Sequence, residues 1–204
     1  MLPLRDTPRL RLILDGFERV VVTALFAWLA IRIVEKLPEN PVNLIFLASE
    51  AVVACMVLLR RPAQDISLRP LDWAISFAGT FLIMLAMPTA GGWPPAGILL
   101  LAGLAISLGA KLSLRRSFGV VAANRGVKTD GLYTAVRHPM YLGYFIGNLG
   151  MLLANPSAWN FVIVAAWTVC QLMRIAAEER ILLQDDRYRA HAAKVRFRLI
   201  PFVY

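Results

Sequence analysis

The chain has 204 residues, of which 58% are hydrophobic and 17% charged, and its mean hydropathy is +0.61. A soluble domain usually has about 45–50% apolar residues, and here the apolar residues form long blocks, which indicates a membrane protein. The formal net charge of +9 comes from basic residues between those blocks, where Lys and Arg set topology and contact anionic lipid headgroups. This distribution argues against a nucleic-acid-binding protein.

Six apolar segments reach or approach the roughly 20 residues that a helix needs to cross a bilayer. In chain order they are residues 17–34, 42–59, 71–87, 96–112, 140–154 and 158–173. Arginines precede the first segment, but no small-residue cleavage site follows it, so we interpret it as a retained span rather than a signal peptide. Only the turn sequence Asn155-Pro156-Ser157 separates the last two segments, which predicts a tight helical hairpin. We therefore expect an all-α, polytopic transmembrane bundle of about six spans.

The basic residues alternate from one connection to the next. The N-terminal tail, the loop after the second span, the segment after the fourth and the C-terminal tail are rich in Lys and Arg. The other connections carry Lys36 with Glu39, or no charge at all. Because positive charge marks the cytoplasmic side, we expect both termini in the cytoplasm. The Ala- and Arg-rich composition suggests a GC-rich bacterial genome, and so a bacterial inner membrane.

The first four spans carry little that suggests chemistry, and we treat residues 1–112 as a four-helix transmembrane region. Glu50 lies midway along the second span, where ionisable side chains are usually functional or paired. Arg32 is a candidate partner, and a neutral glutamic acid bonded to a neighbouring helix is the alternative. Small residues at four-residue spacing let helices approach closely. The clearest examples are Gly103 with Ser107, and Gly143 with Gly147.

Residues 113–204 hold the groups that suggest a binding site. The polar segment from Lys111 to Arg137 is too long for a simple turn, and such loops are often functional. It ends in His138-Pro139, and a proline suits the first turn of a helix, whose free N–H groups and positive dipole accept a carboxylate or phosphate. Glu178 and Glu179 lie where the sixth helix would leave the bilayer, with Arg174 one turn earlier and able to pair with Glu178.

Spaced motifs in this region resemble a known family. They are Gly131-Leu132-Tyr133, the stretch RHPMYLG at 137–143, Glu178-Glu179 with Leu182, and RLIP at 198–201. In combination they are similar to the isoprenylcysteine carboxyl methyltransferases and to the related phospholipid N-methyltransferases, over residues from about 117 to 204. The resemblance implies a membrane methyltransferase that binds S-adenosylmethionine at a cytoplasmic pocket without a Rossmann domain, and the chain has no GxGxxG. It also implies an amphiphilic acceptor from the bilayer, either a prenylcysteine-like carboxylate or a phospholipid amine.

The resemblance also implies roles for individual residues. Glu179 would receive the methionine ammonium, with Glu178 supporting it. Arg137 would orient the acceptor or the cofactor carboxylate. Arg174 lies one position out of register with a substrate-binding arginine of the prenylcysteine enzymes. The other expected cofactor contacts are Arg125, Gly126, Val127, Lys128, Gly131, Tyr133, His138, Pro139, Tyr141 and Gly143.

Two departures from the family pattern concern the acceptor end. The segment Leu183-Gln184-Asp185-Asp186 reaches Tyr188 over a shorter distance than in the family, and His191 replaces a second tyrosine. Two alternatives stay open: an NADPH-dependent membrane sterol-type reductase, and a non-catalytic membrane module such as an assembly or sensor protein. The paired glutamates favour the methyltransferase over the reductase. No metal-binding motif is evident.

Overall fold

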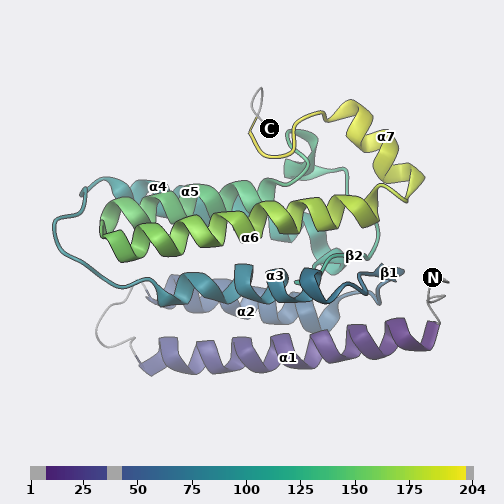
Figure 1. The fold of residues 1–204 in the computed structure, drawn as a ribbon, viewed down its shortest axis with the longest axis horizontal. Coiled ribbons are helices and arrows are strands. Elements are labelled where there is room, and N and C mark those ends of the chain that lie inside the picture. Colours follow the sequence, from purple (N-terminus) through teal and green to yellow (C-terminus); the bar gives the residue numbers. More distant parts are fainter. Residues whose placement is uncertain (1–7, 36–42, 201–204) are drawn as a thin grey trace.

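The computed structural model describes residues 8–35 and 43–200, which form a bundle of long helices lying side by side (Figure 1). The long helices are α1 (Pro8–Glu35), α2 (Asn43–Leu59), α3 (Pro70–Phe81), α4 (Ala96–Leu114), α5 (Pro139–Ala154) and α6 (Ala158–Leu182). The shorter elements are β1 (Asp65–Ile66), η1 (Leu82–Leu85), η2 (Arg115–Ser117), β2 (Ala123–Asn124), η3 (Gly131–Thr134) and α7 (Asp186–Lys194). The described part of the chain is mostly helical, as the sequence predicted.

Each of the six predicted apolar segments coincides with a helix, although α1 begins well before the expected segment. Within the described residues, Ala96–Ser117 and Ala158–Leu182 are long and apolar enough to cross a membrane, and Pro70–Leu85 and Pro139–Ala154 are shorter apolar helices. Large apolar side chains such as Trp28, Phe161 and Val162 lie exposed on the outside of the bundle, which suits a lipid-facing surface. These features support a membrane protein, while the count of six spans stays a prediction.

The helices α4 and α5 approach closely because small residues face one another across their interface. A Cβ on Gly103 would lie 2.3 Å from the backbone nitrogen of Gly147, and one on Gly143 would lie 2.5 Å from that of Ser107. The structure therefore confirms the predicted packing of small residues. The turn at 155–157 joins α5 to α6, yet α5 packs more extensively on α4 than on α6, so a tight hairpin of the last two helices stays a prediction.

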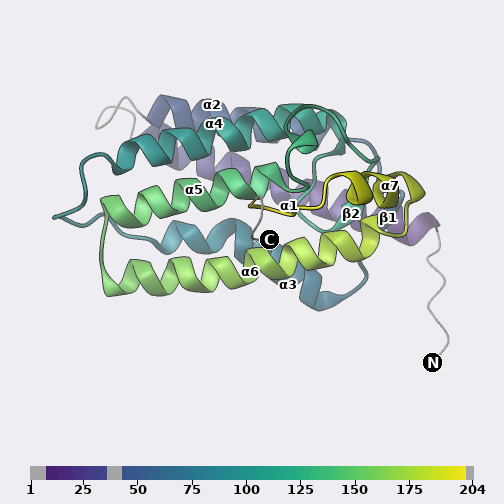
Figure 2. The ribbon, with the colours of Figure 1, turned by 90° about the horizontal axis from the view of Figure 1, so that it is seen from above.

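Three stretches far apart in the sequence meet at one end of the bundle. There β1 pairs antiparallel with β2, with Asp65 opposite Asn124 and Ile66 opposite Ala123. The backbone nitrogen of His138 donates to the carbonyl of Arg198 over 2.8 Å, so the segment before α5 also pairs with the C-terminal segment. The start of α1 and α7 lie at this same end, opposite the α5–α6 turn (Figures 1 and 2).

Candidate functional site

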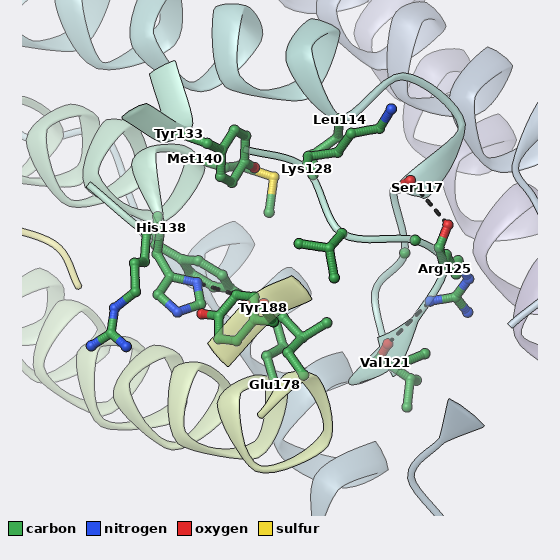
Figure 3. A pocket seen from close by; sticks show the side chains of 17 residues that line it. Leu114, Ser117, Val121, Arg125, Lys128, Tyr133, His138, Met140, Glu178 and Tyr188 are labelled. Carbon is green, nitrogen blue, oxygen red and sulfur yellow. Dashed lines mark hydrogen bonds and ion pairs between the residues drawn. The ribbon is translucent and has the colours of Figure 1, made fainter. Parts of the chain in front are cut away.

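A pocket lies at this end of the bundle, between the start of α5 and the last turns of α6 (Figure 3). We call it the polar pocket. It is narrow, with a cavity volume of about 80 Å³. Its lining residues are Leu114, Ser117, Gly119, Val121, Ala123, Arg125, Gly126, Val127, Lys128, Tyr133, Arg137, His138, Met140, Tyr141, Glu178, Leu182 and Tyr188.

Most of the residues that the sequence predicted as functional line this pocket. They are Arg125, Gly126, Val127, Lys128, Tyr133, Arg137, His138, Tyr141 and Glu178. Five expected residues lie outside it, namely Gly131, Pro139, Gly143, Arg174 and Glu179.

Gly131 has a φ of +60° and its Cβ would lie 2.5 Å from the Ser113 hydroxyl, so the turn itself requires glycine. Pro139 is the first residue of α5. Gly143 faces α4, and its expected contact with the cofactor stays a prediction.

The two adjacent glutamates have different environments. Glu179 is 2% exposed, and its carboxylate lies 2.7 Å from Arg198 Nε, 3.2 Å from Arg137 Nη1 and 3.3 Å from His138 Nε2. The Tyr188 hydroxyl also donates to Glu179 over 3.3 Å. These partners surround its oxygens, and the expected contact of Glu179 with the cofactor ammonium stays a prediction.

Glu178, in contrast, lines the polar pocket itself. It accepts a hydrogen bond from the Tyr141 hydroxyl, and its Oε2 lies 3.8 Å from His138 Nδ1. Its side chain keeps 20% of its surface exposed. The geometry therefore favours Glu178, rather than Glu179, as the carboxylate that faces a ligand.

Tyr133 and Tyr188, which lie outside the long helices, are held in their neutral form. Burial raises the pKa of the Tyr133 phenol well above its usual range, and the nearby Glu178 carboxylate raises it further. Burial likewise raises the pKa of Tyr188, and Glu179 adds to that shift. A neutral phenol can donate a hydrogen bond and present an apolar ring face, so both residues suit a ligand with an aromatic group.

Arg125 contributes to the pocket in a way that the sequence did not predict. Its Nη2 lies 2.6 Å from Glu18 and 2.9 Å from Asp15, both on α1, and the same two carboxylates pair with Arg60 at 3.0 Å. Glu18 also accepts hydrogen bonds from the backbone nitrogens at positions 120 and 121 over 2.8 and 3.0 Å. We call Asp15, Glu18, Arg60 and Arg125 the α1 clamp. Its charges pair with one another, while the Nε of Arg125 has no hydrogen-bond partner among the described residues and Arg125 also lines the polar pocket. The expected contact of Arg125 with a cofactor stays a prediction.

A second and larger cavity, of about 460 Å³, lies among the long helices. We call it the apolar cavity, because residues such as Phe26, Leu104 and Trp167 line most of it. All six long helices, α1 to α6, contribute side chains to its lining. Met140 lines both this cavity and the polar pocket. Arg174 lines this cavity and lies over the ring of Tyr141, 5.4 Å from its centroid. The expected pair of Arg174 with Glu178 does not form among the described residues.

Several contributors to the two sites escaped the sequence reasoning. The sequence offered a signal for Tyr188 as a site residue, because it follows the paired glutamates at a shorter distance than in the family. Asp15 and Glu18 also had one, as two acids close to the start of the first apolar segment. Lys111 had none, because we counted it among loop charges while the structure buries it in the last turn of α4. The side chain of Glu50 lies outside the described part of the chain.

The fold and the site together support a helical membrane protein, with a polar pocket beside an apolar cavity. The family model of phospholipid methyltransferases matches residues 96–187, from the start of α4 into α7. Over 89 residues the chain is 36% identical to a Protein-S-isoprenylcysteine O-methyltransferase of Schizosaccharomyces pombe, covering 39% of this chain and 37% of that protein. The chain thus spans little more than a third of the length of this relative. Both matches support an isoprenylcysteine and phospholipid methyltransferase-like family, as the motifs suggested.

Proposed function

We propose that this chain is an S-adenosylmethionine-dependent methyltransferase that acts at the membrane on an amphiphilic acceptor. The observation that carries the proposal is the adjacency of the two cavities, which share Met140. A polar cofactor and an apolar acceptor need separate sites that meet at the reacting atoms. The polar pocket suits the first and the apolar cavity suits the second. The relationship to methyltransferases supports this proposal over a reductase or a non-catalytic module.

The residues of the polar pocket fit this cofactor by their chemistry. Glu178 offers a carboxylate for the ammonium group, and Lys128 and Arg137 offer positive charge for the carboxylate. The buried Nε of Arg137 has no hydrogen-bond partner among the described residues, so an added acceptor atom would satisfy it. When bound, the cofactor supplies an electrophilic methyl group on its sulfonium. Because the pocket is narrow, we expect its side chains to move apart on binding.

The protein's own contribution is to hold groups in place and to exclude water, which is most of what an in-line displacement requires. Glu179 holds Arg137 and His138 against α6, while Tyr141 fixes the orientation of Glu178. A carboxylate acceptor needs no base. An amine acceptor must first lose a proton, for which Glu178 and His138 are candidate proton acceptors in the pocket.

We also propose six spans with both termini in the cytoplasm, the last two helices forming a hairpin, and the polar pocket opening to that side. The acceptor site in this proposal is not confined to the first four helices. Helices α5 and α6 contribute Tyr144, Trp167 and Arg174 to the apolar cavity. The N-terminal part, in turn, supports the cofactor loop through the α1 clamp.

The test uses the whole protein in lipid nanodiscs. Calorimetry with S-adenosylmethionine should give saturable binding, and NADPH should give none. Incubation with methyl-labelled cofactor and a total lipid extract should transfer label to an organic-soluble product. Absence of cofactor binding in correctly folded protein would contradict the proposal, as would binding of NADPH alone.

A further inference from the structure

The polar pocket is smaller than the cofactor proposed for it. Its cavity measures about 80 Å³, whereas pockets that enclose small-molecule ligands usually measure about 300–1,000 Å³. At least one wall must therefore move outward when the cofactor enters and return once it is bound. The wall that moves should be the one that is attached least firmly to the rest of the bundle.

Helix α7 meets this description. In Figure 1 it stands out from the six long helices at one end of the molecule, and it packs only lightly on the other described helices and strands. Of its nine residues, Tyr188 and His191 are buried, and Tyr188 lines the polar pocket. A connection of three residues, 183–185, joins α7 to α6. A movement of α7 would therefore widen the pocket and leave the long helices in place.

A hydrogen bond at the start of α7 attaches it to the opposite wall. The side-chain amide of Asn124 donates to Oδ2 of Asp185 over 3.0 Å, across 61 positions of sequence. Asn124 lies in β2 and is 4% exposed, and its neighbours Ala123 and Arg125 both line the polar pocket. We call this bond the α7 latch. It joins the loop on one side of the pocket to the helix on the other.

A second hydrogen bond holds each partner of the latch in place. Asp185 is the N-cap of α7, and its Oδ1 accepts from the backbone nitrogen of Arg187 over 2.9 Å. Oδ1 of Asn124 accepts from the backbone nitrogen of Gly126 over 2.9 Å. The Asn124 amide beside Asp185 lowers the pKa of that carboxyl below its usual range, so the acceptor is ionised at neutral pH. The latch is thus a charge-assisted bond between two oriented groups.

The other attachments of α7 converge on Glu179. The Tyr188 hydroxyl donates to Glu179 over 3.3 Å. Beyond the end of α7, Nε of Arg198 lies 2.7 Å from Glu179 Oε2, and the carbonyl of Arg198 accepts from the backbone nitrogen of His138. The chain is therefore anchored before and after α7, and release of the latch lets the helix swing outward without detaching.

We propose that Asn124 and Asp185 are positioning residues, whose bond holds α7 and Tyr188 against the polar pocket while the cofactor is bound. This inference rests on the proposed function and adds the control of cofactor release to it. Neither side chain has to touch the cofactor. The latch acts through Tyr188, because a closed α7 keeps that ring in the pocket wall, slows departure of the cofactor and excludes water from it.

An exchange of the two side chains tests the latch. Asn124→Asp keeps an oxygen for the backbone of Gly126 but places a second carboxylate opposite Asp185, where like charges repel. The double variant Asn124→Asp/Asp185→Asn again sets a donor opposite an acceptor, and asparagine is a good N-cap. Release of labelled S-adenosylmethionine is measured on the whole protein in phosphatidylcholine nanodiscs, after a chase with unlabelled cofactor. The single variant should release it roughly tenfold faster, and the double variant should return to within about twofold of the native rate. A native rate in the single variant, or no recovery in the double variant, would overturn the inference.

Asp185→Ser separates the latch from the helix cap. Serine caps a helix about as well as aspartate, but its shorter side chain does not reach Asn124. Release should again be roughly tenfold faster, at a melting temperature close to the native one. The matched control is Asp186→Asn, which removes a neighbouring carboxylate whose exposed side chain pairs with Arg189 within α7. Equal acceleration in this control would assign the effect to the charge of α7 and contradict the latch.

Hydrogen exchange then reports on the movement itself. Cofactor should slow amide exchange across residues 186–194 in the native protein and in the double variant, and much less in Asp185→Ser. Unchanged exchange of α7 on cofactor binding would reject α7 as the moving wall. The same samples separate the two levels of the proposal. Lack of cofactor binding by the native protein rejects the proposed function, whereas binding that the latch variants do not alter rejects only this inference.

Discussion

The polar pocket and the apolar cavity differ in how their charges are satisfied. Around the polar pocket, Glu179 and Arg125 have partners within the protein at 3.3 Å or less. In the apolar cavity, the side chain of Arg174 bonds instead to Gln171 and to the carbonyl of Val120, both neutral. A charged partner holds a side chain more strongly than a neutral one. The comparison thus separates the charge pairs that maintain the shape of a site from the polar contacts that orient a single side chain.

The largest effect should come from breaking the α1 clamp, which belongs entirely to the first class. Glu18→Ala leaves Arg60 and Arg125 short of a buried counter-ion and removes the acceptor for two backbone N–H groups, so we expect a loss of about 3–5 kcal/mol in stability. Thermal unfolding in detergent measures it. Glu35→Ala is the control, because its pair with Arg32 is exposed at 3.9 Å and is worth about 0–1 kcal/mol. Similar losses in the two variants would remove the distinction between the clamp and a surface pair.

The next test separates the two glutamates by cofactor affinity. Glu178→Ala removes the carboxylate that faces the polar pocket, and it should weaken binding of S-adenosylmethionine by about 1.5–3 kcal/mol, or roughly tenfold to a hundredfold. Glu179→Gln keeps the size of the side chain. It should reduce the thermal stability of the protein and have a smaller effect on its affinity for the cofactor. Calorimetry of both variants measures the difference. If only Glu179→Gln lost affinity for the cofactor, the ammonium contact would belong to Glu179, as the family resemblance implied.

A third test concerns the apolar cavity. Arg174→Ala should raise the apparent KM for the acceptor roughly tenfold, since one charge-assisted contact is lost, and should leave cofactor affinity almost unchanged. Steady-state kinetics and calorimetry on the same preparation give the two values. The opposite pattern, in which cofactor affinity falls while the acceptor KM holds, would assign Arg174 to the cofactor site.

The smallest effect should be a pH dependence from His191, which is 6% exposed near the polar pocket. Burial lowers its pKa, and Arg137 and His138 nearby lower it further. The unfolded chain therefore binds a proton more readily than the folded one, and stability falls as the pH drops below the ordinary histidine pKa of about 6.5. Thermal unfolding between neutral and mildly acidic pH should show this decline, and His191→Gln should reduce it. An identical decline in the variant would assign it to another group.

The sequence predicted the helices well because their signal is local. Apolar blocks and the proline at position 139 mark helix positions without reference to the rest of the chain. Most of the motif residues also gather around the polar pocket, because each motif is a short stretch of neighbouring residues.

The remaining contacts depend on partners that no local pattern specifies. Arg125 looks like an ordinary loop arginine until Asp15, 110 positions earlier, is placed beside it. The sequence allowed Gly143 a role in helix packing or in cofactor approach, and its contact with the α4 backbone became visible only once α4 was in place. Lys111 belongs to a basic stretch in the sequence, and its burial depends on how α4 meets Tyr144.

The α1 clamp also bears on how the protein is made. Glu18 is bonded to the backbone at position 120, a separation of 102 residues, so the pocket loop cannot take its final shape until α1 to α4 have been synthesised. Until then, the carboxylates of Asp15 and Glu18 must be hydrated or paired with other groups. Contacts of such long range slow folding. The stretch that matches the methyltransferase family begins at residue 96, and it therefore relies on a scaffold that was translated well before it.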